Sequence, residues 1–179
     1  MIISPYKVND VIKRSDISTG NIFTYQTGNG TRYASLGRNN GFYYGFKLQM
    51  GSYFDDENAK HKPIKAVVTP VTSQTVDKMC VIVGYFTLDL AFDNMPQIRT
   101  YDGKSIPPFG SIISTPNFVN RDGKPHLFMN LGASVHSERG IDLYPLSEDG
   151  NIKMLEFGSL LAIRGNVNFI THEQKEKKA

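Results

Sequence analysis

The stretch that decides the fold runs from Cys80 to Phe92 and reads CVIVGYFTLDLAF. Apolar residues gather at alternate positions on one face, namely Ile82, Phe86, Leu88, Leu90 and Phe92. The opposite face is mixed and carries Val83, Tyr85, Thr87 and Asp89. A period of two with one apolar face is typical of a half-buried β-strand. The stretch therefore predicts a long strand whose face from Ile82 to Phe92 packs on the core.

Four further segments alternate in the same way. They run from 42 to 50, from 64 to 68, from 127 to 131 and from 161 to 169, and Pro70 is expected to close the second. Asp-Gly dipeptides, which favour tight hairpin turns, lie at Asp102-Gly103, Asp122-Gly123 and Asp149-Gly150. Gly165, which follows Arg164 inside the last segment, predicts a β-bulge. Many short strands with regular turns predict an antiparallel barrel or sandwich.

The N-terminal residues predict one short helix. Ser4 is a suitable N-cap, Pro5 suits the first helical position, and Val8, Val11 and Ile12 fall at helical spacing as far as Ser15. The predicted fold is therefore all-β, with this helix against an antiparallel barrel of the oligonucleotide-binding (OB) type. A jelly-roll or β-sandwich is the alternative. One domain is expected over residues 1–172, followed by a charged tail over residues 173–179.

Composition narrows the function classes without choosing one. The chain has 179 residues, is 40% hydrophobic and carries a formal net charge of +3, which is compatible with a polyanionic partner. Cys80 is the single cysteine and lies in an apolar run, so it predicts a core residue and excludes an internal disulfide. No signal peptide or long apolar stretch is recognised. We therefore expect no membrane association and a location in the cytoplasm of a host cell.

No pattern in the chain predicts catalysis. Gly103-Lys104-Ser105 resembles the end of a phosphate-binding loop, but Ile98 occupies the position where that loop requires glycine. The histidines are scattered at His61, His126, His136 and His172, without the spacing of a zinc site. We expect no enzymatic activity, no cofactor and no metal.

The segment from Arg32 to Lys47 interleaves basic, aromatic and small residues. A single strand of nucleic acid needs cations for its phosphates and flat rings on which its bases stack. Strand alternation places Tyr43 and Lys47 on one face, predicted to be exposed, opposite Phe42, Tyr44 and Phe46. The predicted binding residues are Arg38, Asn40, Tyr43, Lys47, Tyr85, Arg121, Lys124, Phe128 and Arg164.

These observations predict a non-enzymatic protein of phage or plasmid type that binds single-stranded nucleic acid with little dependence on base sequence. Aromatic residues are also favoured in strands for packing alone, so the same pattern fits an ordinary sheet. The alternative is a viral or phage structural protein, of a capsid or tail, that self-assembles through the same surfaces and is located in the virion. A homo-oligomer is expected, and a monomer of fixed size would favour the nucleic-acid-binding protein over the structural alternative.

Overall fold

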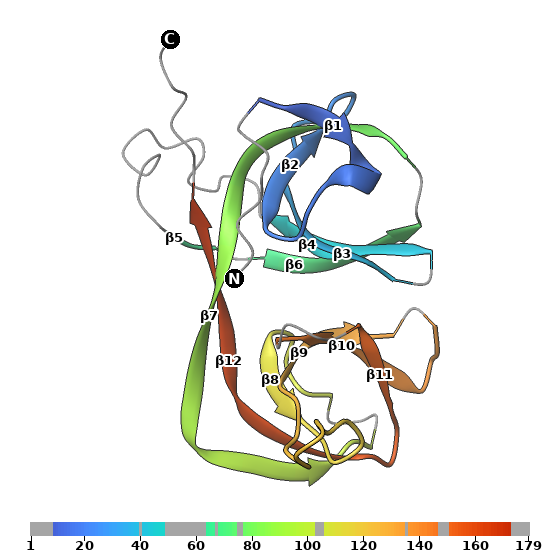
Figure 1. Ribbon diagram of the computed structural model, residues 1–179, viewed down its shortest axis with the longest axis vertical. Helices are drawn as coiled ribbons and strands as arrows, with labels where there is room; N and C mark the ends of the chain where they lie inside the picture. Colours follow the sequence, from blue (N-terminus) through green and yellow to red (C-terminus); the bar gives the residue numbers. More distant parts are fainter. Residues whose placement is uncertain are drawn as a thin grey trace. The chain divides into compact units, whose positions relative to one another are not determined.

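A computed structural model describes residues 9–39, 41–48, 64–66, 68–74, 77–102, 106–134, 136–146 and 151–172. Across these residues the regular structure is β-strand, apart from one short 3-10 turn (Figure 1). The strand pairs that the structure defines are antiparallel. The predicted all-β class and its antiparallel pairing are confirmed.

The elements follow one another in an order that Figure 1 labels along the chain. The first part holds β1 (Val11–Lys13), the 3-10 turn η1 (Arg14–Asp16), β2 (Asn21–Tyr25), β3 (Tyr33–Asn39), β4 (Phe42–Leu48), β5 (Ile64–Ala66) and β6 (Val68–Gln74). The rest holds β7 (Met79–Thr100), β8 (Ser111–Ser114), β9 (Phe128–Ala133), β10 (Gly140–Pro145), β11 (Lys153–Glu156) and β12 (Leu160–His172).

The chain forms two compact units that share their longest strands. Unit 1 contains Met1–Asp89 and Phe169–Ala179, and unit 2 contains Leu90–Asn168. Strands β7 and β12, which are neighbours in the sheet, each contribute residues to both units (Figure 1). The expected single domain over residues 1–172 stays a prediction, as does the charged tail, which lies outside the described residues.

In unit 1, strands β2, β3, β4 and β6 are successive neighbours in the sheet. Strand β4 confirms the segment predicted from Phe42, and its side chains Tyr44, Phe46 and Leu48 are buried. Cys80 is fully buried beside Phe23 and Ile82, which confirms it as a core residue.

Pro70 does not close a strand, because it lies inside β6 opposite Phe46. Strand β6 ends the sheet order, and a proline, which has no N–H to donate to a neighbour, is tolerated on such an edge.

In unit 2, strands β8 to β11 pair in sequence around an apolar cluster that contains Tyr101, Ile113, Phe128, Ile141, Leu143, Leu155 and Leu161. The predicted turn at Asp122-Gly123 is confirmed between the bridged residues Val119 and Pro125. The predicted bulge is confirmed as well, since the pairing of β12 with β8 shifts between Ile163 and Gly165. A side chain at Gly165 would overlap the carbonyl oxygen of Ala91.

Other expectations differ from the structure. Val11–Lys13 is a strand paired with β7, and Arg14–Asp16 is a 3-10 turn, so helix is wrong there. The helical spacing of Val11 and Ile12 is overridden by pairing with the long strand. Residues 1–8, where the helix was expected to begin, lie outside the described residues.

The closed OB barrel is not observed, because the sheet order ends at β11 on one side and β6 on the other within the described strands. Membrane crossing by a helix is also not indicated, since the described part of the chain contains no helix long and apolar enough. The inward face predicted from Ile82 to Phe92 holds only in part. Ile82 and Phe86 are buried, whereas Phe92 is 56% exposed.

Candidate functional site

An open pocket in unit 2 brings together two of the cations predicted from the sequence. It has a volume of about 550 Å³ and is lined by Phe92, Asp93, Asn94, Pro96, Lys124, Pro125, Leu127 and Arg164. Lys124 and Arg164 are 40 positions apart in the sequence, and the fold places both at this one pocket. We call Phe92, Lys124 and Arg164 the unit 2 surface.

Local structure orients the Arg164 side chain and the backbone at Lys124. The Nε of Arg164 donates to the hydroxyl of Ser114 at 2.6 Å, which orients the planar guanidinium beside the Gly165 bulge. Lys124 ends a tight turn in which its backbone N–H donates to the Asn120 side chain at 2.9 Å. Its own side chain is exposed. Arg121, another predicted residue, is exposed in the same turn. The turn therefore presents two basic side chains from a hydrogen-bonded loop.

Phe92, which no pattern in the sequence marked as a binding residue, supplies the flat ring of this surface. Strand alternation placed Phe92 on the core face, but β7 leaves the unit 1 core after Phe86 and every residue from Ala91 to Ile98 is exposed. An exposed ring beside two cations is the combination that single-stranded nucleic acid uses for stacking and phosphate contact. Asp93 lines the same pocket and offsets part of the positive charge.

In unit 1 the exposure predicted for Tyr43 is wrong. The register confirms that Tyr43 and Lys47 share a face, since they pair with Ser73 and Thr69 along the same neighbour. Lys47 is exposed, but Tyr43 is only 4% exposed because the guanidinium of Arg14 lies 4.1 Å from the centre of its ring. A base cannot stack on a ring that is already covered.

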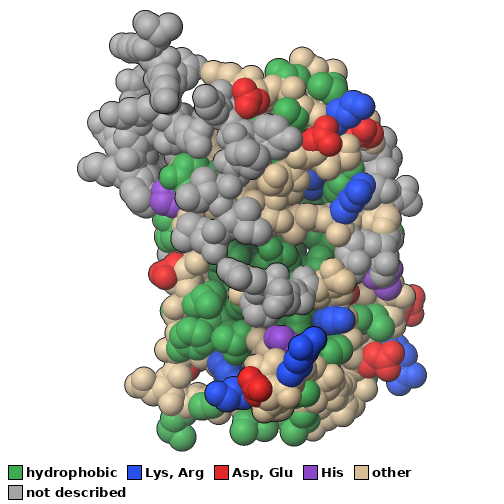
Figure 2. All heavy atoms as spheres, viewed as in Figure 1, with side chains coloured by type: hydrophobic (Ala, Val, Ile, Leu, Met, Phe, Trp, Pro, Cys, Tyr) green, Lys and Arg blue, Asp and Glu red, His purple; other side chains and the backbone are tan. Residues whose placement is uncertain are grey.

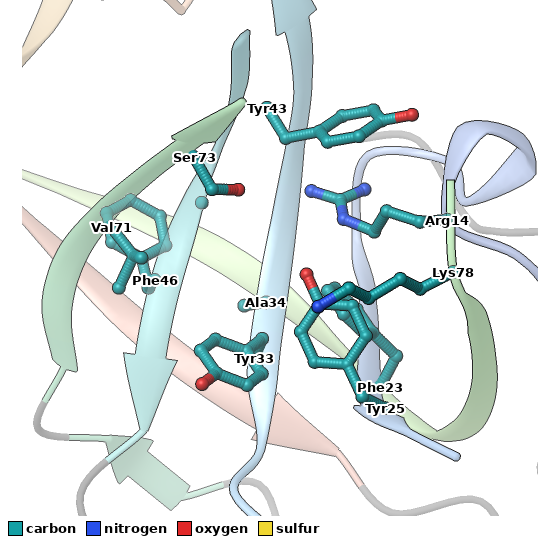
Figure 3. Close-up of a pocket in the computed structure, with 11 residues that line it drawn as sticks. Arg14, Phe23, Tyr25, Tyr33, Ala34, Tyr43, Phe46, Val71, Ser73 and Lys78 are labelled. Carbon is teal, nitrogen blue, oxygen red and sulfur yellow. The ribbon is translucent and has the colours of Figure 1, made fainter. Parts of the chain in front are cut away.

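Arg14 belongs to a second pocket, which has a volume of about 430 Å³. Figure 3 shows its guanidinium pointing between Tyr43 and Phe23, with Tyr25, Tyr33, Ser73 and Lys78 around the same space. Burial lowers the pKa of Arg14 and raises that of Tyr25, and each group opposes the shift of the other. No pattern in the sequence singled out Arg14.

Two other predicted residues, Arg38 and Tyr85, line neither pocket. Arg38 is exposed on β3, opposite Tyr43. Tyr85 is half-buried and its ring stacks on His172 with centroids 4.6 Å apart. Asn40 lies outside the described residues.

Phe128 corrects a second stacking prediction. It is 2% exposed and packs in the unit 2 cluster, with its ring centroid 5.6 Å from that of Phe118. Consecutive residues of β9 are buried on both of its faces, so alternation gave this ring no solvent-facing side.

Basic side chains are dispersed on the face of the molecule that Figure 2 draws. On the face drawn in Figure 2, the described Lys and Arg side chains are scattered among Asp and Glu instead of forming one broad basic patch. The described residues contain no group of three or more His, Cys, Asp or Glu that could hold an ion. The sites that remain are small and are built from a few cations and rings.

Comparison with protein-family models, with curated proteins and with solved structures finds no match to this chain.

Proposed function

We propose that this chain is a non-enzymatic protein that binds single-stranded nucleic acid through the unit 2 surface. The observation that carries the proposal is the convergence of Lys124, Arg164 and the exposed ring of Phe92 on one open pocket. Two cations match two neighbouring phosphates, and the ring offers a face to a base. Neither contact depends on which base is present, so binding is largely independent of sequence.

Strand surfaces supply these contacts without a closed barrel. Gly165 bends β12 where Arg164 projects, and the turn that carries Lys124 is fixed by its own hydrogen bonds. Arg121 extends the same basic turn. Because the Arg164 guanidinium is already held by Ser114, it loses little conformational entropy when a ligand binds.

The test is a titration of the full-length protein with a fluorescently labelled single-stranded oligonucleotide at several salt concentrations. Binding is expected to weaken steeply as salt rises, because each phosphate contact releases counterions. Duplex of the same sequence is expected to bind less well, because its bases are not free to stack. Absence of binding at low salt, where electrostatic attraction is strongest, would contradict the proposal.

A self-assembling structural protein is the second candidate. Met95 is 83% exposed and Ile98 is 68% exposed on β7, and an assembly that buried these apolar side chains against another subunit would be stabilised by their removal from water. Light scattering on the same sample separates the two functions. Large assemblies without nucleic acid favour the structural protein, whereas a small species of fixed size favours the binding protein.

A further inference from the structure

The pocket around Arg14 in unit 1 has an unusual charge arrangement. Arg14 is 4% exposed, yet the groups that interact with its charge are Tyr25, Tyr43 and the thiol of Cys80. None of the described residues that line the pocket is acidic. A buried guanidinium is expensive to desolvate, and proteins usually offset that cost with a carboxylate.

Hydrogen bonds within the protein do not satisfy every N–H donor of the Arg14 guanidinium. One terminal nitrogen donates to the hydroxyl of Ser35 at 3.3 Å, and Tyr25 provides a further side-chain hydrogen bond. The Nε has no hydrogen-bond partner among the described residues. A guanidinium carries five N–H donors in a planar fork that suits carboxylate or phosphate oxygens. One buried donor of Arg14, a residue that lines the pocket, is therefore left without a hydrogen-bond partner among the described residues.

The walls of the pocket are flat and mostly apolar. Phe23 and Tyr33 stack with centroids 5.8 Å apart, and Tyr25 meets Tyr33 edge-on at 5.4 Å (Figure 3). A second cation, Lys78, lies 5.6 Å from the centre of the Tyr25 ring. The volume of about 430 Å³ falls in the range of small-molecule sites, roughly 300–1,000 Å³. Phe23 is covered by Arg14 and Tyr33, so the partly exposed rings of Tyr25 and Tyr33 are the surface that a flat body can contact, and the two cations accept an anionic end.

From this geometry we propose that the Arg14 pocket binds a small molecule in which a phosphate or carboxylate is carried by a flat ring system. The anionic oxygens pair with Arg14 and Lys78, and the ring lies against the tyrosines. This site is separate from the unit 2 surface and does not depend on nucleic-acid binding there. A nucleoside monophosphate and an aromatic acid share the required chemistry.

Isothermal titration calorimetry on the full-length protein tests the site with four probes: adenosine 5′-monophosphate, 4-hydroxybenzoate, adenosine and inorganic phosphate. At least one of the two ring-bearing anions is expected to bind tenfold or more tightly than adenosine and than phosphate. Comparison of the two anions then identifies which oxyanion the pocket takes. The proposal is wrong if adenosine or phosphate binds as tightly as the better-bound of the two ring-bearing anions, or if neither ring-bearing anion binds at millimolar concentration.

Two variants locate the binding without disturbing the buried Arg14. Ser73→Leu fills the pocket from the exposed edge strand β6, and Lys78→Gln removes an exposed charge. Each substitution is expected to lower the affinity for the ring-bearing anion at least tenfold. Lys153→Gln, an exposed lysine of unit 2 that lines neither pocket, is the matched control and leaves the affinity unchanged. Unchanged affinity in both pocket variants would overturn the assignment.

The oligonucleotide titration keeps this proposal distinguishable from the proposed function. Ser73→Leu should leave oligonucleotide binding intact while it removes binding of the small anion. If the same substitution abolished both, the two sites would be one and the assignment of nucleic acid to unit 2 would be wrong.

Discussion

The guanidinium carbon of Arg14 lies 4.1 Å from the centre of the Tyr43 ring, and this contact joins the N-terminal turn η1 to strand β4. The contact gives both residues structural roles that differ from the roles expected from the sequence. Tyr43 becomes a buried partner of a cation rather than a ring open to solvent, and Arg14 becomes a buried charge held over aromatic faces. Phe23 takes the second contact at 4.8 Å.

The first prediction concerns the energy of this contact. A desolvated cation–π pair is worth about 2 kcal/mol, so Arg14→Met and Tyr43→Leu should each lower the free energy of unfolding. Their double-mutant cycle should give a coupling energy of about 1–2 kcal/mol, measured by urea unfolding. Tyr44→Leu is the matched control, because Tyr44 is equally buried but projects from the opposite face of β4. A coupling to Tyr43 no larger than that to Tyr44 would contradict the contact.

The second prediction concerns alkaline pH. Burial raises the pKa of the Cys80 thiol from 9.0 to about 11, because the thiolate loses its hydration. Between these two values the unfolded chain ionises while the folded chain does not, so the unfolded state is favoured increasingly. The free energy of unfolding should therefore be insensitive to this thiol below pH 9 and fall by roughly 1–3 kcal/mol on its account as the pH rises to about 11.

Cys80→Ala provides the check on that assignment. The substitution should cost about 1 kcal/mol at neutral pH through lost packing, and the alkaline fall should become smaller. It should not vanish, because burial also raises the pKa of Tyr25. Native wild-type protein should also resist thiol reagents until it is unfolded. Rapid labelling of the native thiol would show that Cys80 is accessible and that β7 is placed in the wrong register.

The third prediction concerns Gly165. Its φ of 154° is a conformation that glycine alone adopts readily, and an added Cβ would overlap the carbonyl oxygen of Ala91. Gly165→Ala should lower the free energy of unfolding by roughly 3 kcal/mol, from backbone strain and overpacking together. Gly123→Ala is the control, since it has a φ of 77° but open space around it and should cost only about 1–2 kcal/mol. Equal losses would mean that the close approach to Ala91 is absent.

Local patterns in the sequence correctly predicted the structural features that depend on neighbouring residues. Period-two alternation identified β4 and β7, an apolar run identified buried Cys80, and a lone glycine in a strand identified the bulge at Gly165. Each of these features has its cause within a few positions of the residue concerned. Side-chain burial along a strand is therefore predictable as long as one face meets the core and the other meets water.

Long-range contacts account for the predictions that failed. Tyr43 is covered by Arg14, which is 29 positions away, and alternation along β4 carries no information about that partner. Val11 pairs with Val81 in β7, so a segment with helical spacing became a strand. Phe92 belongs to the same alternating face of β7 as Phe86, but it lies beyond the core that buries Phe86. Predictions of binding residues failed most often, because a site is assembled from segments that only the fold brings together.

The last prediction separates the two kinds of contact on the unit 2 surface. Lys124→Gln and Arg164→Gln should each reduce the slope of log affinity against log salt by about 0.7 on a single strand, since each removes one phosphate contact. Phe92→Ser should leave that slope unchanged and cost about 1–3 kcal/mol of binding free energy, the contribution of one stacked base. Because Phe92 is 56% exposed, its replacement should barely alter stability, which thermal unfolding checks.

Lys153→Gln removes the same charge at an exposed lysine elsewhere in unit 2, and it should leave both the slope and the affinity near the wild-type values. If Lys153→Gln matched Lys124→Gln in both quantities, binding would be a general effect of net charge and no site would exist. If Phe92→Ser bound as tightly as wild type while the slopes fell as expected, the strand would be held by its phosphates alone. The pocket between Lys124 and Arg164 would then contact the backbone without receiving a base.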